Sequence, residues 1–202
     1  MKTQLVNFER DTESDGILDA IYSRRAVRQY LSKRVSERHI RAVIDAAIQA
    51  PSAMNNQPWA FIVIQNPRLL NQISREAKQE IFRSPEWGRS RSHVPVDDPE
   101  FNIFYGATTL IVICAKTEAG FFPFGDCYLA AQNLMLSAHQ LGLATCPIGL
   151  ARDVLRERTW RSELSIPADY EPVLPIIVGY GAGTTPPTPR APAKFISWHR
   201  NT

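Results

Sequence analysis

The segment Asp126–Leu141 constrains the fold most strongly, because apolar side chains cover nearly the whole circumference of the helix that its spacing predicts. These side chains are Leu129, Ala130, Leu134, Met135, Leu136, Ala138 and Leu141. A helix that is apolar on all sides is normally shielded from water. Other elements must therefore pack around it, either within one chain as a central helix or across a subunit interface. Gly142 follows at the usual position for ending a helix.

Apolar runs of strand length supply the rest of the predicted core. Little alternation of apolar and polar residues is found in Trp59–Ile64, Ala107–Ala115 and Val173–Val178. Such runs are typical of strands that are covered on both faces. A shorter strand or turn is predicted at Ala144–Pro147, and one or two helical turns at Asp153–Trp160.

Helical periodicity marks three further segments. It predicts a first helix over Asp15–Ser23 and a second that Ser36 caps and Pro51 ends. A third helix is expected to begin at Pro67, where the missing N–H of proline is harmless.

Length and composition indicate a single domain covering residues 1–202. The net charge of +3 comes without the concentrated basic tract of a nucleic-acid binder. No apolar run has the length of a signal-peptide core or a membrane span. We therefore expect no nucleic-acid or membrane partner and a cytoplasmic location. The 3 cysteines and 4 histidines have spacings that predict neither a disulfide framework nor a metal site.

The segment 83–102 shows neither a helical nor a strand period. It is longer than most connections in compact domains, which predicts a lid or a binding loop. Candidate substrate contacts within it are Trp87, Arg89, Arg91 and His93.

The C-terminal segment 184–202 predicts an extended tail that either wraps a partner or brings Arg190 back to a site. The glycines of residues 179–183 superficially resemble a dinucleotide-binding loop. Such a loop needs a helix behind it, and Pro186 and Pro187 prevent one from forming. We therefore exclude a Rossmann site.

Two polar stretches suit a ligand with a flat heteroaromatic ring and a phosphate. The turn before Trp59 carries side chains that both donate and accept hydrogen bonds, namely Ser52, Asn55, Asn56 and Gln57. The stretch 24–30, predicted as a loop or short strand, carries guanidinium groups that bind phosphate oxygens in pairs: Arg24, Arg25 and Arg28. The alternatives are an ordinary turn and a solvated basic face.

Several motifs occur in an order that resembles the nitroreductase family of FMN-dependent oxidoreductases. They are Arg24-Arg25-x-x-Arg28, Pro51-Ser52-x-x-Asn55-x-Gln57-Pro58-Trp59, the helix Ala130–Leu136 leading to Gly142-Leu143, the turn Pro147-Ile148-Gly149, and Pro189-Arg190. The resemblance extends from about Tyr22 to Trp198, which is nearly the whole chain.

This resemblance implies an α+β fold with a mostly antiparallel central sheet, flanking helices and a long buried central helix. It implies FMN as cofactor and NAD(P)H as reductant, with electrons passed in two steps to a nitroaromatic, a quinone or a similar small acceptor. It also implies a homodimer whose active sites are shared between subunits. No side chain is expected to act as a catalytic acid or base, since flavin hydride transfer does not require one.

The resemblance also assigns roles to individual residues. The phosphate would be held by Arg24, Arg28 and Arg190, with Arg25 as a fourth candidate. The ring and ribityl chain would contact the partner's Pro51–Gln57 segment, through Pro51, Ser52, Asn55 and Gln57. The turn Pro147, Ile148 and Gly149 would lie against the ring, with the Gly149 N–H as donor to flavin N5. The sequence departs from relatives at Ala26 (often Ser), Thr188 (sometimes Lys) and Gly149 (acidic in one branch).

Two alternatives stay open at this level. The first keeps FMN and changes the chemistry to dehydrogenation, dehalogenation or flavin processing. The second is a flavin-binding protein without turnover.

Overall fold

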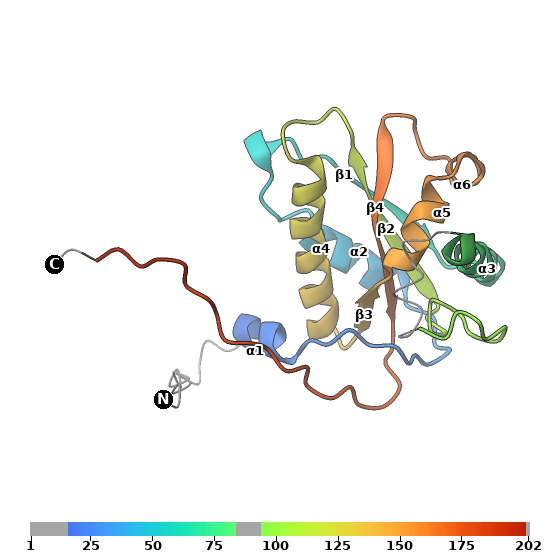
Figure 1. The fold of residues 1–202 in the computed structure, drawn as a ribbon, viewed down its shortest axis with the longest axis horizontal. Coiled ribbons are helices and arrows are strands. Elements are labelled where there is room, and N and C mark those ends of the chain that lie inside the picture. Colours follow the sequence, from blue (N-terminus) through green and yellow to red (C-terminus); the bar gives the residue numbers. More distant parts are fainter. Residues whose placement is uncertain (1–15, 84–93, 201–202) are drawn as a thin grey trace.

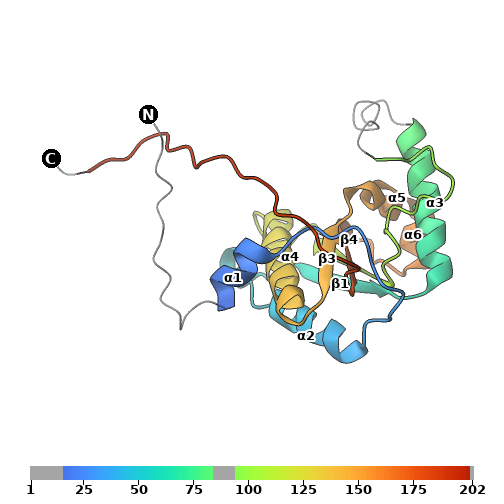
Figure 2. The same ribbon diagram turned by 90° about the horizontal axis from the view of Figure 1, so that it is seen from below.

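The computed structural model describes residues 16–83 and 94–200 and shows a four-stranded sheet between two layers of helices (Figures 1 and 2). The strands are β1 (Trp59–Ile64), β2 (Thr109–Lys116), β3 (Ala144–Pro147) and β4 (Tyr170–Gly179). The helices are α1 (Gly16–Ser23), α2 (Glu37–Ala47), α3 (Pro67–Arg83), α4 (Pro123–Gln140), α5 (Arg152–Arg156) and α6 (Arg158–Glu163), with short 3₁₀ turns η1 (Ala53–Asn55) and η4 (Gly149–Ala151). Their arrangement is α+β.

The sheet has the strand order β1-β2-β4-β3, and every neighbouring pair is antiparallel. Alternate residues of β2 pack into two separate cores, because successive side chains of a strand point to opposite faces of the sheet. Ile111 and Ile113 pack with α2 and α4, whereas Leu110 and Val112 pack with α3, α5 and α6. Burial on both faces explains why β2 is apolar without alternation.

Most predicted elements are confirmed with small shifts of their ends. The strand Trp59–Ile64 and the short strand Ala144–Pro147 have the predicted bounds. Ser36 caps α2 by accepting the His39 N–H at 3.3 Å. The last strand begins earlier than predicted, at Tyr170, because a register shift in its pairing with β2 accommodates Pro172.

The long helix α4 is buried on one face, whereas the sequence predicts burial on nearly all sides. Ala130, Leu134 and Ala138 are fully buried against the sheet and α2. On the opposite face, Tyr128 and Leu129 are 49% and 48% exposed in the single chain. The interface role, the second of the two roles predicted for this helix, therefore stays open and is taken up below.

The tail has no helix or strand over residues 184–200, and it leaves the body on the side of α1 (Figures 1 and 2). Phe195, Ile196 and Trp198 are all largely exposed on it. Within residues 16–83 and 94–200, none of the helices combines the length and apolarity needed to cross a bilayer.

Candidate functional site

The basic stretch runs along the free edge of β3. Ala26 forms a parallel bridge with Thr145, and the Val27 N–H donates to the Thr145 carbonyl at 3.1 Å. Tyr30 forms an antiparallel bridge with Gly181. Arg24, Arg25 and Val27 line one cavity of about 330 Å³ at this edge, together with His139 and Thr145. Ala26 packs instead against the core cluster that contains Cys146 and Ile148.

Arg24 carries a buried polar atom that lacks a partner. Its Nη1 is among the few buried side-chain polar atoms without a hydrogen bond to any residue that the structure describes. Burial lowers the pKa of Arg24, the nearby Cys146 thiol acts in the opposite direction, and the charges of Arg25 and Arg190 lower it further. Guanidinium groups stay charged in proteins, so an anion is a suitable partner for the buried Nη1.

Further polar groups lie on the same side of β3. Burial raises the pKa of Cys146, and the charges of Arg28 and Arg24 oppose that rise. Burial raises the pKa of Tyr105, against the charge of Arg28 and its hydrogen bond to the phenol. Tyr30 also has a raised pKa through burial, and its hydroxyl lacks a partner among the described residues. The arginines thus border a partly desolvated polar region.

The side chains of Arg25 and Arg190 both donate hydrogen bonds to nearby backbone carbonyls. Arg25 Nη1 donates to the Tyr22 and Arg24 carbonyls at 2.6 Å and 2.8 Å, so its side chain is turned onto the backbone. Arg190 Nη1 donates to the Pro189 carbonyl at 3.2 Å, and its charge still reaches Arg24. The charges of both Arg25 and Arg190 therefore act on Arg24, and Arg28 and Arg24 both act on Cys146.

The polar turn has a strained backbone. Met54, Asn55 and Gln57 have φ values of 53°, 56° and 45°, although none of them is glycine. The Ser52 hydroxyl accepts the Gln57 N–H at 3.0 Å, and Gln57 Nε2 lies 3.2 Å from Asn55 Oδ1. Pro51, Asn55 and Gln57 remain exposed. Strain of this kind is frequent where a backbone is shaped for a ligand.

The third motif follows β3 directly. Ile148 is buried, and its N–H donates to the Pro175 carbonyl at 2.8 Å. Pro147 is half-buried, whereas Gly149 is exposed and begins η4. The first N–H groups of a helical turn have no partner within that turn. A side chain at residue 149 would meet no heavy atom within 4 Å. Glycine is therefore not required there by crowding.

One chain does not unite these three motifs. Ser23 Oγ lies 2.7 Å from His139 Nε2, which places the basic stretch at the C-terminal end of α4. The Ala53 N–H contacts the Asp126 carboxylate, which places the polar turn at the N-terminal end. A rise of 1.5 Å per residue separates the two ends by about 20 Å. Pro147–Gly149 follows β3, next to the basic stretch.

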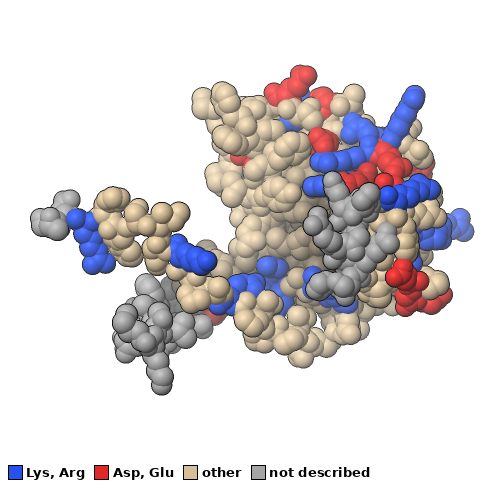
Figure 3. All heavy atoms as spheres, viewed as in Figure 1, with Lys and Arg blue, Asp and Glu red and all other residues tan. Residues whose placement is uncertain are grey.

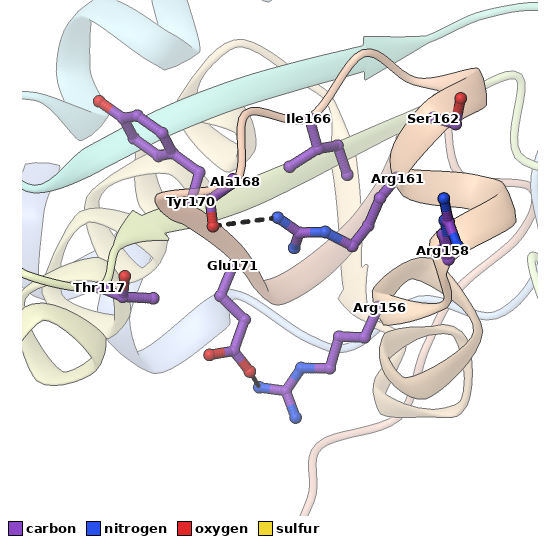
Figure 4. Close-up of a pocket in the computed structure, with 9 residues that line it drawn as sticks. All are labelled: Thr117, Arg156, Arg158, Arg161, Ser162, Ile166, Ala168, Tyr170 and Glu171. Atoms are coloured by element: carbon purple, nitrogen blue, oxygen red, sulfur yellow. Dashed lines mark hydrogen bonds and ion pairs between the residues drawn. The ribbon is translucent and has the colours of Figure 1, made fainter.

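A second arginine-rich region lines a cavity of about 610 Å³ formed by α5, α6 and the start of β4 (Figure 4). Arg156 is paired with Glu171 at 2.5 Å. Arg161 Nη2 donates to the Pro167 carbonyl at 2.8 Å and to the Ala168 carbonyl at 3.4 Å. The guanidinium groups of Arg156 and Arg161 thus have partners within the chain.

The predicted lid is fixed over its second half. Lys78 Nζ donates to the carbonyls of Asp98, Pro99 and Phe101 at 3.1, 3.1 and 2.8 Å, which fastens this segment to α3. The candidate contacts Trp87, Arg89, Arg91 and His93 lie outside the described residues. Within the described ranges, His, Cys, Asp and Glu side chains form no group that could hold a metal.

Comparison with known proteins decides the family. The model of the nitroreductase family matches residues 21–180. The chain belongs to the nitroreductase family. A protein of Methanothermobacter thermautotrophicus, provisionally named an NADH dehydrogenase/NAD(P)H nitroreductase, is 31% identical over 82% of this chain and 78% of its own.

Two other members show the breadth of this family. An iodotyrosine deiodinase of Thermotoga neapolitana is 26% identical over 86% of this chain and 93% of its own. The crystal structure of a Bacteroides fragilis nitroreductase with bound FMN is 25% identical, covers 91% of this chain and 98% of its own, and has a TM-score of 0.78. The fold of this nitroreductase-family chain is thus that of its solved relatives.

Sequence reasoning missed several residues of the site. Tyr30 lies at the end of the basic stretch, and its polar and charged neighbours give no indication that it is partly buried. Cys146 lies among apolar residues, which does not distinguish it from a core residue. Asp126 and Tyr105 gave no local signal, because their contacts are with residues distant in sequence.

Proposed function

We propose that this chain is an FMN-dependent oxidoreductase that passes electrons from NAD(P)H to a small acceptor such as a nitroaromatic or a quinone. The observation that carries the proposal is the buried Arg24 Nη1, which lacks a partner in the described part of the chain. A phosphate oxygen would satisfy it with a charge-assisted bond. The bound FMN of the Bacteroides fragilis nitroreductase supports the choice of ligand.

The residues around Arg24 suit the two ends of such a cofactor. Arg24, Arg28 and Arg190 would hold the phosphate, and Arg25, which lines the same cavity as Arg24, would add positive charge. The exposed Gly149 N–H would donate to the ring, held in place by the buried Ile148. FMN supplies the hydride chemistry when bound, and the protein supplies binding and orientation.

We further propose that the functional unit is a homodimer. The polar turn and the basic stretch lie at opposite ends of α4, so a second copy would have to supply Ser52, Asn55 and Gln57 to each flavin. Exposed apolar side chains support this: Ile17 on α1 is 73% exposed, and Leu129 on α4 is 48% exposed. A second copy of the chain would cover these side chains.

The test is direct. The purified protein should be yellow and release FMN on denaturation. Under nitrogen, NADH or NADPH should bleach the flavin absorbance, and a nitroaromatic or quinone should restore it. A preparation that takes up no FMN overturns the proposal. Bound FMN that neither nucleotide reduces would instead favour a flavin-binding protein without turnover.

A second candidate activity is reductive dehalogenation, which the likeness to an iodotyrosine deiodinase favours. It uses the same flavin site and differs only in the acceptor. Halide release from a halogenated phenol, without reduction of nitroaromatics or quinones, would identify the protein as a reductive dehalogenase.

A further inference from the structure

Asp126 makes a contact that joins the long helix to the polar turn. Its carboxylate is 5% exposed and lies in the first turn of α4. The backbone N–H of Ala53 donates to both of its oxygens, at 3.3 Å to Oδ1 and 3.2 Å to Oδ2. η1, which contains Ala53, accordingly lies beside that end of α4 (Figure 1).

The turn needs such an external support. Positive φ values at Met54, Asn55 and Gln57 cost about 1–3 kcal/mol each and persist only where surrounding contacts hold them. The bond from the Gln57 N–H to the Ser52 hydroxyl closes the turn internally. It does not fix the turn relative to the body of the protein, whereas the bond to Asp126 does.

A second contact bears on the same turn from the next loop. The Asn56 side chain packs against Gly120, where an added Cβ would lie 2.2 Å from Asn56 Nδ2. Gly120 has a φ of +77°, which a larger residue adopts only with strain. The turn is therefore held between the Asp126 carboxylate and the backbone at Gly120.

We propose that Asp126 is a positioning residue that fixes the turn 51–57 for the flavin of the partner subunit. The inference rests on the proposed function, since it needs FMN and a homodimer. Asp126 lies beneath the turn and contacts its backbone, so it acts through the placement of Asn55 and Gln57. In the proposed dimer, Asp126 of one chain therefore affects the flavin site whose phosphate is held by Arg24 of the other chain.

The single variants come first. Asp126→Ala should weaken FMN affinity about tenfold, since one bond to a charged group contributes about 1.5–3 kcal/mol and part of the turn's order remains. Asp126→Asn retains an amide oxygen that can accept the Ala53 N–H and should recover part of the affinity. Asp45→Ala, at an exposed aspartate of α2, is the matched control and should leave affinity unchanged.

The deciding experiment is a mixed dimer of Arg24→Ala and Asp126→Ala chains, isolated with two different affinity tags. If Asp126 serves the partner's flavin, both defects fall in one site and the other site is intact. The mixed dimer should then bind one FMN with wild-type affinity. If Asp126 served its own chain's site, each site would carry one defect and neither would bind tightly.

The outcomes separate the inference from the proposed function. No tight site in the mixed dimer, or the absence of any mixed dimer, overturns the inference. Asp126→Ala with wild-type affinity overturns it as well, while the FMN proposal stands. Two tight sites, or an Arg24→Ala homodimer that binds FMN normally, overturns the assignment of Arg24 instead.

Discussion

The two arginine-rich regions of this chain differ in what their charges meet. At the α5–α6 cavity, Arg156 is paired with Glu171 and Arg161 donates to backbone carbonyls (Figure 4). In the basic stretch, the Nη1 atom of Arg24 is buried and has no partner within the described chain. Basic and acidic side chains also intermingle over the α3–α5 side of the molecule (Figure 3).

This difference teaches that the density of arginines is a weaker guide to a ligand site than their unmet hydrogen bonds. The α5–α6 cavity has about 610 Å³, against about 330 Å³ for the cavity at Arg24, and several guanidinium groups line it. The guanidinium groups of Arg156 and Arg161 are bonded within the fold. A buried guanidinium without an anion would destabilise the protein unless a ligand supplies one. Each prediction below tests this contrast, starting with the largest expected effect.

The largest effect is expected on cofactor affinity. Arg24→Ala should weaken FMN binding about 100-fold, since it removes bonds between charged groups in a partly buried site. Arg161→Ala should leave FMN affinity unchanged, because its donors face carbonyls of its own chain. Flavin fluorescence on titration with FMN measures both. Comparable losses in the two variants would contradict the contrast.

The second effect concerns two buried thiols, Cys114 and Cys127, of which Cys114 lies within range of the Arg161 charge. Burial raises the pKa of Cys114, which the charge of Arg161 opposes, and that of Cys127, in both cases from 9.0 to about 12. The fold thus favours the protonated thiols. Their contribution to stability is complete below pH 9 and is lost as the pH rises toward 12.

The free energy of unfolding should therefore fall by about 1.4 kcal/mol per pH unit for each thiol in that window. Urea unfolding at several alkaline pH values, with a reductant present, measures the slope. The double variant Cys114→Ala, Cys127→Ala should be less stable at neutral pH and should have a flatter slope. An unchanged slope would assign the alkaline loss to other groups, such as Tyr30.

Much of the fold is predictable from the sequence, because buried positions are apolar and recur with the period of the helix or strand that carries them. The strands β1 and β3 and the start of α3 follow directly from apolar runs and from Pro67. The start of β4 does not, because Pro172 argues against a strand until its place at an irregularity of the ladder is known. The exposure of one face of α4 could not be predicted either, since Leu129 on that face is as apolar as the buried residues of the helix.

The site is predictable where its residues are close in sequence. Arg24 and Arg28 form one short motif, and Ser52, Asn55 and Gln57 form another. The orientation of Arg25 onto the carbonyls of Tyr22 and Arg24 could not be read from the motif, because both orientations have the same sequence. The contact of Asp126 with Ala53 spans the chain and requires the folded structure.

A smaller effect is expected from the structural arginine pair. Glu171→Ala removes the partner of Arg156, whose Nε still donates to the Pro172 carbonyl at 3.2 Å. The pair is about one-third exposed on both sides, so its loss should lower the free energy of unfolding by about 1 kcal/mol. FMN affinity should not change. A drop in affinity, seen in the same fluorescence titration, would identify the α5–α6 cavity as part of the flavin site.

The smallest effect is a gain. Ala26 lies between Arg24 and Arg28 in the basic stretch, where it forms a bridge with Thr145. Ala26→Ser would add a hydroxyl two residues from Arg24 and should strengthen FMN binding by about 0.5–1.5 kcal/mol, or a few-fold. Ala168→Ser adds a hydroxyl at the α5–α6 cavity and should give no gain. If both variants bind FMN like the wild type, the phosphate does not lie beside Ala26, and the role of Arg24 would have to be assigned to another anion.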